Sequence, residues 1–372
     1  MKYLKKFETH TEYETYKDSE DYLTPNVSYC VDRNDVHFEK YFIDYPKEYL
    51  TFYAMEDTEF SIVFEKGLQS KTKLYITRAM RESFSYSIDD GETWVTFETP
   101  NDTYSGIALT TPTIHAGEKV LWKGIGTQNF VHGTSHAYCH FTSSGRFIAY
   151  GNMMSIIYGD MFIDKNDLEN NHILSCFFYN NTYLISAQNL ILSATTLADN
   201  CYNNMFSGCT SLTTAPELPA TTMVLGCYNG MFIDCTSLTT APELPSTILA
   251  ERCYGSMFSG CTSLATAPEL PATTLTGNCY YNMFKGCASL TTAPELPATT
   301  LTDNCYVGMF NGCSNLNYIK AMFTTTPSTS YTNSWVNGVA ASGTFVKNSA
   351  ATWNVTGNSG IPSGWTVETA SA

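Results

Sequence analysis

The sequence predicts a multidomain, β-rich α+β protein: a small helix-and-hairpin segment, a β-sandwich, and a repeat solenoid with a C-terminal cap. Three observations support this. A motif recurs every 26 residues in the second half. Short runs of alternating apolar and polar residues precede it. Charged side chains are concentrated near the start of the chain. Residues 1–100 carry 20 acidic and 12 basic side chains, whereas residues 201–372 carry 8 acidic and 4 basic ones.

Residues 1–46 form the predicted helix-and-hairpin segment. Aromatic spacing gives Lys5–Tyr22 the pattern of a short amphipathic helix, and Val27–Cys30 and Val36–Phe38 flank a polar turn, as in a hairpin. The sequence Lys-Lys-Phe-Glu-Thr-His, followed by Pro-Asn-Val-Ser-Tyr-Cys, is similar to the N-terminal segments of proteins of gut Bacteroidales and their phages. That resemblance implies an attachment or assembly segment that contacts other virion proteins.

The sequence of residues 47–157 predicts a β-sandwich. Four alternating runs predict short strands: Phe60–Phe64, Lys73–Ile76, Trp94–Phe97 and Lys119–Trp122. Ser87–Trp94 matches S-x-D-x-G-x-T-W, the Asp-box of sialidase propellers. In those propellers the box is a structural hairpin turn, in which Asp caps backbone amides and Trp packs below. A single box cannot build a propeller, so we do not expect a sialidase.

The repeat occupies residues 158–319 and predicts a solenoid. Its unit reads Cys-Tyr-x-x-Met-Phe-x-x-Cys-x-x-Leu-x-x-Ala-Pro-Glu-Leu-Pro-x-Thr, as from Cys279 to Thr299, and a degenerate copy precedes the regular ones. Two columns of cysteines, each with a 26-residue step, define the period: Cys201, Cys227, Cys253, Cys279 and Cys305, and Cys209, Cys235, Cys261, Cys287 and Cys313. Residues 320–372 diverge and are expected to cap the stack.

Each coil should contain a short helix and an irregular extended segment. Cys201, Met205 and Cys209 lie four apart, which places them on one helical face. Pro216 and Pro219 cannot donate hydrogen bonds, so the extended part should be short. A single coil would gain roughly 8–15 kcal/mol from its apolar side chains, whereas ordering 26 residues costs about 1–2 kcal/mol each. Only stacked coils are therefore stable.

The run Met-Phe-x-x-Cys-x-x-Leu, followed by a segment ending in Leu-Pro, resembles BspA-type bacterial leucine-rich repeats over residues 170–320. The family has slightly shorter units and usually an aliphatic residue where this chain has Cys201. The resemblance implies a leucine-rich-repeat solenoid and a surface that binds a ligand on a host or neighbouring cell. It does not assign ligand positions within the repeat.

We interpret the ten repeat cysteines as buried structural thiols. Spacings of eight and eighteen fit no zinc pattern, and two cysteines eight apart on a helix lie about 12 Å apart, beyond disulfide reach. A bridge between coils is the alternative. The degenerate copy favours thiols, because Asn181 stands where later copies have Cys209, and leucine-rich repeats interchange Asn and Cys at a buried turn.

Two further columns form a candidate ligand face: Glu217, Glu243, Glu269 and Glu295, and Tyr202, Tyr228, Tyr254, Tyr280 and Tyr306. The glutamates would bind cations or sugar hydroxyls if they were not merely a solvated rim. The tyrosines would stack on sugar rings if they did not instead pack against the next coil. A nearly identical repeated surface suits a repetitive ligand such as a polysaccharide, or a spacer, better than a catalytic pocket.

A metal site is the weaker interpretation of a histidine cluster, His132, His136, Cys139 and His140, which lies among glycines and serines typical of a loop. We expect no cofactor and no catalytic residues, since no motif places a pair of acids or a nucleophile. A net charge of −15 argues against nucleic-acid binding, and no apolar run is long enough to insert in a membrane.

These observations predict a non-catalytic binding or structural protein. The residues after Met1 lack the apolar stretch of a signal peptide, which favours a phage virion protein assembled in the host cytoplasm, such as a fibre or receptor-binding protein recognising a cell-surface or mucus glycan or protein. The alternative is a bacterial cell-surface or secreted adhesin, and a glycan-active enzyme is more remote. A fibre-like protein would be a homo-oligomer, commonly a trimer.

Overall fold

The structure, a computed structural model, describes residues 4–7, 28–31, 48–66, 84–96, 108–124 and 137–370. The chain divides into two compact units, Met1–Pro46 and Lys47–Ala372. Within the described ranges, no helix has both the length and the apolar character needed to cross a membrane.

The first unit contains β1 (Leu4–Phe7) and β2 (Ser28–Val31), which pair in parallel with Leu4 opposite Ser28. The helix predicted from Lys5 is therefore wrong at its start, because residues 4–7 pair with a strand whose Tyr29 and Val31 favour extended backbone. The remainder of that helix, and the hairpin partner Val36–Phe38, lie outside the described residues.

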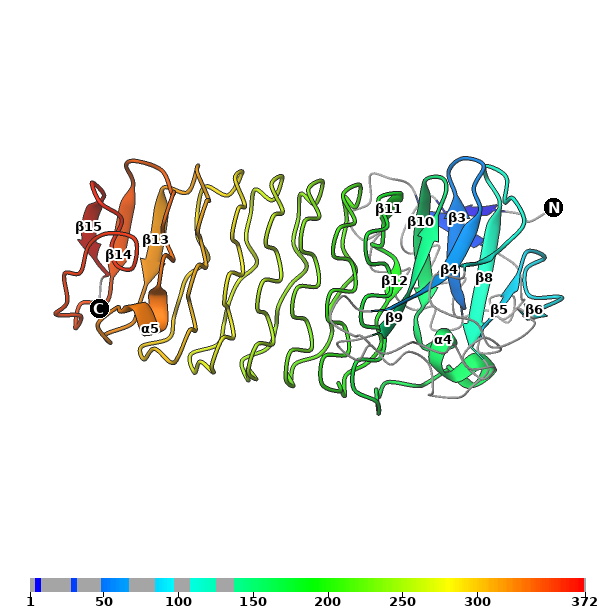
Figure 1. The fold of residues 1–372 in the computed structure, drawn as a ribbon, viewed down its shortest axis with the longest axis horizontal. Helices are drawn as coiled ribbons and strands as arrows, with labels where there is room; N and C mark the ends of the chain where they lie inside the picture. The colour runs from blue at the N-terminus through cyan, green and yellow to red at the C-terminus, as the bar shows by residue number, and fades with distance from the viewer. Residues whose placement is uncertain are drawn as a thin grey trace. The chain divides into compact units, whose positions relative to one another are not determined.

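The second unit begins with two β-sheets (Figure 1). The larger, seven-stranded sheet has the order β11-β10-β3-β8-β5-β6, and β12 also pairs with β10. In the smaller sheet β4 lies between β7 and β9. The elements are β3 (Leu50–Ala54), β4 (Phe60–Lys66), β5 (Phe84–Ser87), β6 (Val95–Thr96), β7 (Ala108–Thr110), β8 (Lys119–Gly124), β9 (Ala137–Ser143), β10 (Phe147–Asn152), α4 (Met154–Tyr158), η2 (Gly159–Met161), β11 (Leu184–Ser186) and β12 (Leu190–Ile191).

Strands β4, β6 and β8 coincide with three of the four strands predicted for this region. The fourth, Lys73–Ile76, lies outside the described residues.

Aromatic rings fill the space between the two sheets. The ring of Phe52 on β3 lies 5.2 Å from that of Phe60 on β4 and 5.3 Å from that of Phe141 on β9, measured between centroids. Trp122 on β8 also contacts Phe141, at 4.8 Å. All four side chains are fully buried, and each gains about 1.5–3 kcal/mol from burial. This shared core holds the sheets face to face.

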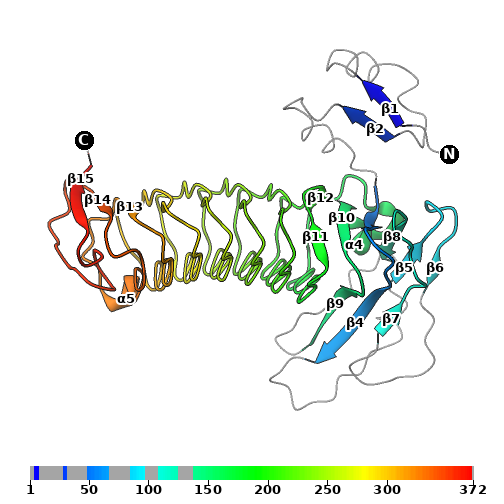
Figure 2. The same cartoon turned by 90° about the horizontal axis from the view of Figure 1, so that it is seen from above.

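Each 26-residue unit forms one coil, and consecutive coils lie side by side between β12 and β13 (Figures 1 and 2). One half of the coil is a run of turns in which backbone amides alternate between two kinds of partner. Met205 N–H donates to Tyr202 C=O three residues earlier, at 3.2 Å. Phe206 N–H donates to Met231 C=O in the next coil, at 2.9 Å. The same alternation recurs in the following coils.

These turns replace the predicted short helix. Cys201, Met205 and Cys209 do lie on one fully buried side, as their spacing predicted. However, φ is +53° at Asn204 and +78° at Gly208, a left-handed conformation that a right-handed helix excludes. The residues at these positions, Asn and Gly, are those that adopt it most readily. The backbone therefore turns every four residues, and half of its amides are free to join the next coil.

The other half of the coil is extended but weakly paired. Thr214, Thr240 and Thr266 form isolated parallel bridges from one coil to the next. Pro216 and Pro219 follow closely and have no N–H to donate, so the ladder does not continue past the bridge.

The first coil stacks directly on the larger sheet, since β10 pairs in parallel with both β11 and β12. The Phe178 ring lies 5.7 Å from Phe52 of that sheet and 5.4 Å from Phe206 of the next coil. From there a column of near-parallel rings runs along the stack with steps of 5.4–5.9 Å, through Phe206, Phe232, Phe258, Phe284 and Phe310. The N-terminal β-sheets therefore cover one end of the coil core.

Stacking continues through the divergent C-terminal residues. A three-stranded parallel sheet is formed by β13 (Tyr318–Ala321), β14 (Thr344–Lys347) and β15 (Thr366–Thr369), with α5 (Thr329–Thr332) between the first two strands. Indole N–H groups bond to carbonyls of neighbouring segments: Trp335 to Gly360 (2.8 Å), Trp353 to Phe323 (3.2 Å) and Trp365 to Ala340 (2.8 Å). Buried tryptophans thus take over the core where the repeat motif ends.

Candidate functional site

The second cysteine column is a ladder of buried thiols that bond to backbone. Each thiol donates to the carbonyl of a phenylalanine in the preceding coil, as Cys261 does to Phe232 at 3.1 Å. The same bond, at 3.0–3.1 Å, is made by Cys209, Cys235, Cys287 and Cys313. In the degenerate copy Asn181 Nδ2 donates to Phe141 C=O at 3.1 Å. Asn and Cys therefore satisfy equivalent carbonyls.

Both cysteine columns are chemically protected. All ten repeat cysteines are free thiols with no exposed surface. Burial raises the pKa of Cys227 to about 11 and that of Cys279 to about 12, so these thiols stay protonated at neutral pH. In the first column Cys227 Sγ lies 3.6 Å from Met223 Sδ, which is ordinary core packing. Over the described residues, no group of three or more His, Cys, Asp and Glu is arranged to hold a metal.

Replacing Cys261 tests the ladder. We expect Cys261→Ala to lower the free energy of unfolding by about 1–2 kcal/mol, through the lost hydrogen bond and the small cavity. Cys261→Asn should cost clearly less, because the amide can donate to Phe232 C=O as Asn181 does to Phe141. Thermal and urea unfolding of the two variants would measure this. Equal losses would show that the thiol only fills space.

The tyrosine column lies inside the protein and not on a ligand face. Tyr202, Tyr228, Tyr254, Tyr280 and Tyr306 are each only 1% exposed. Their rings stack in parallel on one another with centroid steps of 5.6–6.1 Å. The face of each ring therefore packs against the ring of the next coil. The predicted ligand face therefore consists of the glutamates alone.

For one buried tyrosine hydroxyl, we expect a substitution to stabilise the protein, in contrast to the loss of stability expected for Cys261→Ala. Among the described residues, Tyr228 Oη has no hydrogen-bond partner although it is buried. Tyr228→Phe removes this unsatisfied group and should stabilise the protein by about 1 kcal/mol. The matched control is Tyr158→Phe, because Tyr158 Oη donates to Asp167 C=O at 2.9 Å and its loss should destabilise by about 1 kcal/mol. Destabilisation by Tyr228→Phe would indicate a bound water at the hydroxyl.

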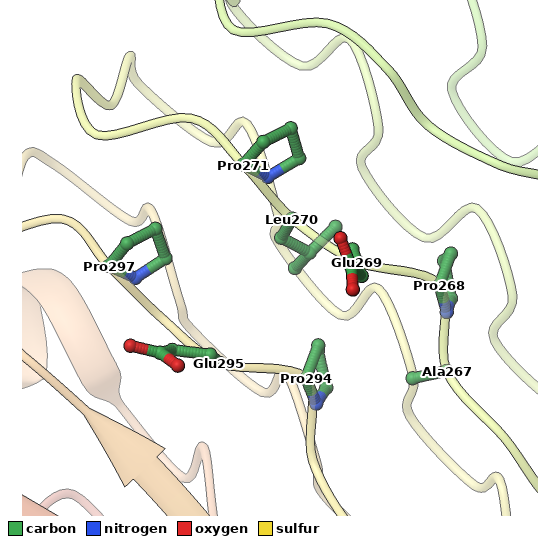
Figure 3. A pocket seen from close by; sticks show the side chains of 8 residues that line it. All are labelled: Ala267, Pro268, Glu269, Leu270, Pro271, Pro294, Glu295 and Pro297. Carbon is green, nitrogen blue, oxygen red and sulfur yellow. The ribbon is translucent and has the colours of Figure 1, made fainter.

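The glutamate column is exposed at every step. Between two successive coils a shallow hollow of about 340 Å³ is lined by Pro268, Glu269, Leu270 and Pro271 of one coil and by Pro294, Glu295 and Pro297 of the next. Figure 3 shows the two glutamates on adjacent segments, each flanked by prolines. Lys320 Nζ forms an ion pair with Glu295 Oε2 at 2.9 Å. Within the described residues, Glu217, Glu243 and Glu269 have no such ion-pair partner.

The histidine cluster is only partly described. His140 lies on β9 and is buried, and its ring lies 6.5 Å from that of Tyr179. Cys139 precedes it on the same strand, with its backbone opposite Phe64. His132 and His136 lie outside the described residues.

The Asp-box forms a tight turn between β5 and β6. Asp89 Oδ1 accepts hydrogen bonds from Ser87 Oγ at 2.6 Å and from Thr93 N–H at 2.9 Å. These bonds, with that of Ser87 the strongest influence, lower the pKa of Asp89 to about 2. Trp94 packs against Tyr49, with centroids 4.9 Å apart, and Lys123 Nζ lies 4.1 Å from its ring centroid. The box therefore fixes the hairpin and positions Trp94.

A polar cluster beside this turn was not predicted. Asp160 accepts from Tyr49 Oη at 2.7 Å and from Lys123 Nζ at 2.8 Å. Lys123, and secondarily Tyr49, lower the pKa of Asp160, while burial together with Asp160 raises that of Tyr49 to about 12. The cluster ties η2 to β8. Its members are distant in sequence and share no local motif, so only the fold reveals it.

Comparison of this chain with known protein families, curated proteins and solved structures finds no match.

Proposed function

We propose that this protein is a non-catalytic binding protein whose stacked coils form a leucine-rich-repeat solenoid, preceded by a β-sandwich and closed by a C-terminal cap. The observation that carries the proposal is the division of each coil into two parts. Its cysteines, tyrosines and phenylalanines lie in the core, while a glutamate, the proline two residues after it and several threonines recur at the surface. Such a surface presents one small set of contacts several times and thus suits attachment to a polymeric or clustered ligand.

We further propose that the protein acts in adhesion or receptor binding, as a fibre-like component of a phage virion. The likeness of its opening residues to proteins of gut Bacteroidales and their phages supports this setting, with residues 1–46 as the attachment segment. The ligand would be a cell-surface or mucus glycan or protein. The second candidate, a bacterial cell-surface adhesin, is favoured by the resemblance of the repeat to BspA-type proteins.

Attachment of the fluorescently labelled full chain to gut bacterial cells and to mucin-coated surfaces tests the adhesion proposal. We expect saturable binding that excess unlabelled chain displaces. Absence of binding to every such surface would refute adhesion. Neighbouring genes for tail or capsid proteins, together with antibody labelling of purified phage particles, would support the virion setting, and labelling of bacterial cells without phage would instead support the bacterial adhesin.

A further inference from the structure

We propose that the proline–glutamate face, defined by Glu217, Glu243, Glu269, Glu295 and their flanking prolines, binds a basic stripe of an α-helix on a partner protein, with one Lys or Arg per coil. This inference rests on the proposed binding function and names the class of partner.

In the last coil of this face, a glutamate already pairs with an ammonium group, that of Lys320 in the same chain. Lys320 Nζ lies 2.9 Å from Glu295 Oε2. Leu296 bridges Ala321, and Leu296 N–H donates to Lys320 C=O, so Lys320 stands in its coil where the preceding coils have glutamate. The chain therefore shows how a lysine sits against this face. The three preceding glutamates repeat the acceptor without supplying the lysine.

The hollow between coils suits the rest of such a side chain. Apart from its two carboxylates, the lining consists of proline rings, one leucine and one alanine. Lys and Arg bury their methylene stems on apolar surface while the charged head stays at a polar rim. The methylene stem of one lysine or arginine would thus lie on the apolar lining of the hollow, and its charged group would reach a glutamate of the same coil.

The spacing of the coils selects a helix over an extended chain. Parallel bridges join successive coils three residues before each glutamate, as at Thr214, Thr240 and Thr266, so these segments lie about 4.8 Å apart. An α-helix has a pitch of about 5.4 Å, so basic residues at i, i+4, i+7 and i+11 would advance by about one coil each and drift by only about 2 Å over four coils. Same-side residues of an extended chain are about 6.7 Å apart and would fall out of register by roughly 6 Å over four coils.

The burial of the aromatic columns argues against a sugar polymer at this face. Flat sugar rings are commonly bound by exposed aromatic side chains, whereas the repeat tyrosines are 1% exposed and the repeat phenylalanines fully buried. What remains outside is a row of carboxylates, whose complement is positive charge.

The test uses the full chain and two alanine-based helical peptides of about 15 residues. One carries four lysines on a single face, at i, i+4, i+7 and i+11, and the other distributes the same four around the helix. Fluorescence anisotropy should show tighter binding of the one-face peptide, weakened by added salt. Replacing the column together, by Glu217→Gln, Glu243→Gln, Glu269→Gln and Glu295→Gln, should weaken binding roughly 16-fold, at about twofold per ion pair.

Two further variants make the test specific. Glu251→Gln removes an exposed carboxylate of the same repeats outside the column and should leave binding unchanged. Lys320→Ala releases Glu295 from its internal partner and should strengthen binding by about twofold. Circular dichroism confirms that each variant remains folded.

Equal binding of both peptides, or no effect of the four glutamine substitutions, would overturn the inference. Glutamate-dependent binding of chitosan with no binding of either peptide would reassign the face to an amino-sugar polymer. If the four-glutamine variant still attaches to cells as well as the unmodified chain, the inference fails and the proposed function stands. If the unmodified chain attaches to no cell or mucin surface, the proposed function fails whatever the peptides do.

Discussion

Raising the pH from 8 to 10 is expected to unfold the coil stack in a narrow interval. The buried thiols and tyrosines have folded-state pKa values raised by desolvation, as for Cys227 at about 11 and Cys279 at about 12. An unfolded thiol ionises near pH 8.5 and an unfolded tyrosine near pH 10. The unfolded chain therefore loses protons that the folded chain retains, so stability is intact below about pH 8.5 and falls as the pH rises.

The size of this effect is comparable to the stability of a whole domain. Each thiol that ionises only on unfolding costs about 1.4 kcal/mol one pH unit above its unfolded pKa. Ten repeat thiols then remove roughly 14 kcal/mol by about pH 9.5, whereas typical domains are stable by 5–15 kcal/mol.

Circular dichroism recorded with thiolate and tyrosinate absorbance would measure this transition. The thiolate absorbance of the ten repeat cysteines should appear together with the loss of secondary structure. As a control, replacing Cys227 and Cys253 by Ala should reduce the slope of unfolding free energy against pH by about 2.7 kcal/mol per unit. Ionisation of the repeat thiols below about pH 10 in a protein with unchanged circular dichroism would contradict the burial of the two cysteine columns.

The substitution Gly343→Ala is expected to lower the free energy of unfolding by about 3 kcal/mol or more. A Cβ at this position would lie 2.3 Å from Asn317 C=O and 2.8 Å from its carbonyl carbon. Both are backbone atoms of the preceding coil, and Thr344 N–H, the next amide along, donates to the same carbonyl at 2.8 Å. Because no side chain can rotate away, the coils themselves would have to separate where β14 begins.

Gly277→Ala is the matched control. Its Cβ would meet nothing closer than 3.8 Å, and its φ lies outside the left-handed region. Alanine there restricts the unfolded chain without a clash, so stability should be unchanged or rise by about 0.4–1 kcal/mol. Thermal unfolding of the two variants separates the effects, and similar losses in both would mean that the cost is not the contact with Asn317.

The period of the repeat and many residues of its core could be predicted from the sequence, because identical residues at a constant spacing occupy equivalent environments. Periodicity does not state which environment that is. Tyr202 and Glu217 recur equally well, yet one column is buried and the other exposed. The four-residue spacing of Cys201 and Met205 was read as a helix, since left-handed backbone at Asn204 leaves the same spacing in sequence. The Tyr49–Asp160 contact spans 111 residues and has no sequence signal.

In the half of each coil that forms a run of turns, the alternating amide hydrogen bonds give the stack a direction. Every second N–H in that half of a coil, such as those of Tyr202, Phe206 and Gly208, donates toward the following coil, and the same sense is kept at Phe310 and Gly312. Peptide dipoles in these rows therefore add head to tail, and in-line hydrogen bonds of this kind polarise one another. The array is an electrically polar rod with its positive end toward the C-terminal coils, and each inserted copy of the repeat would lengthen every row at once.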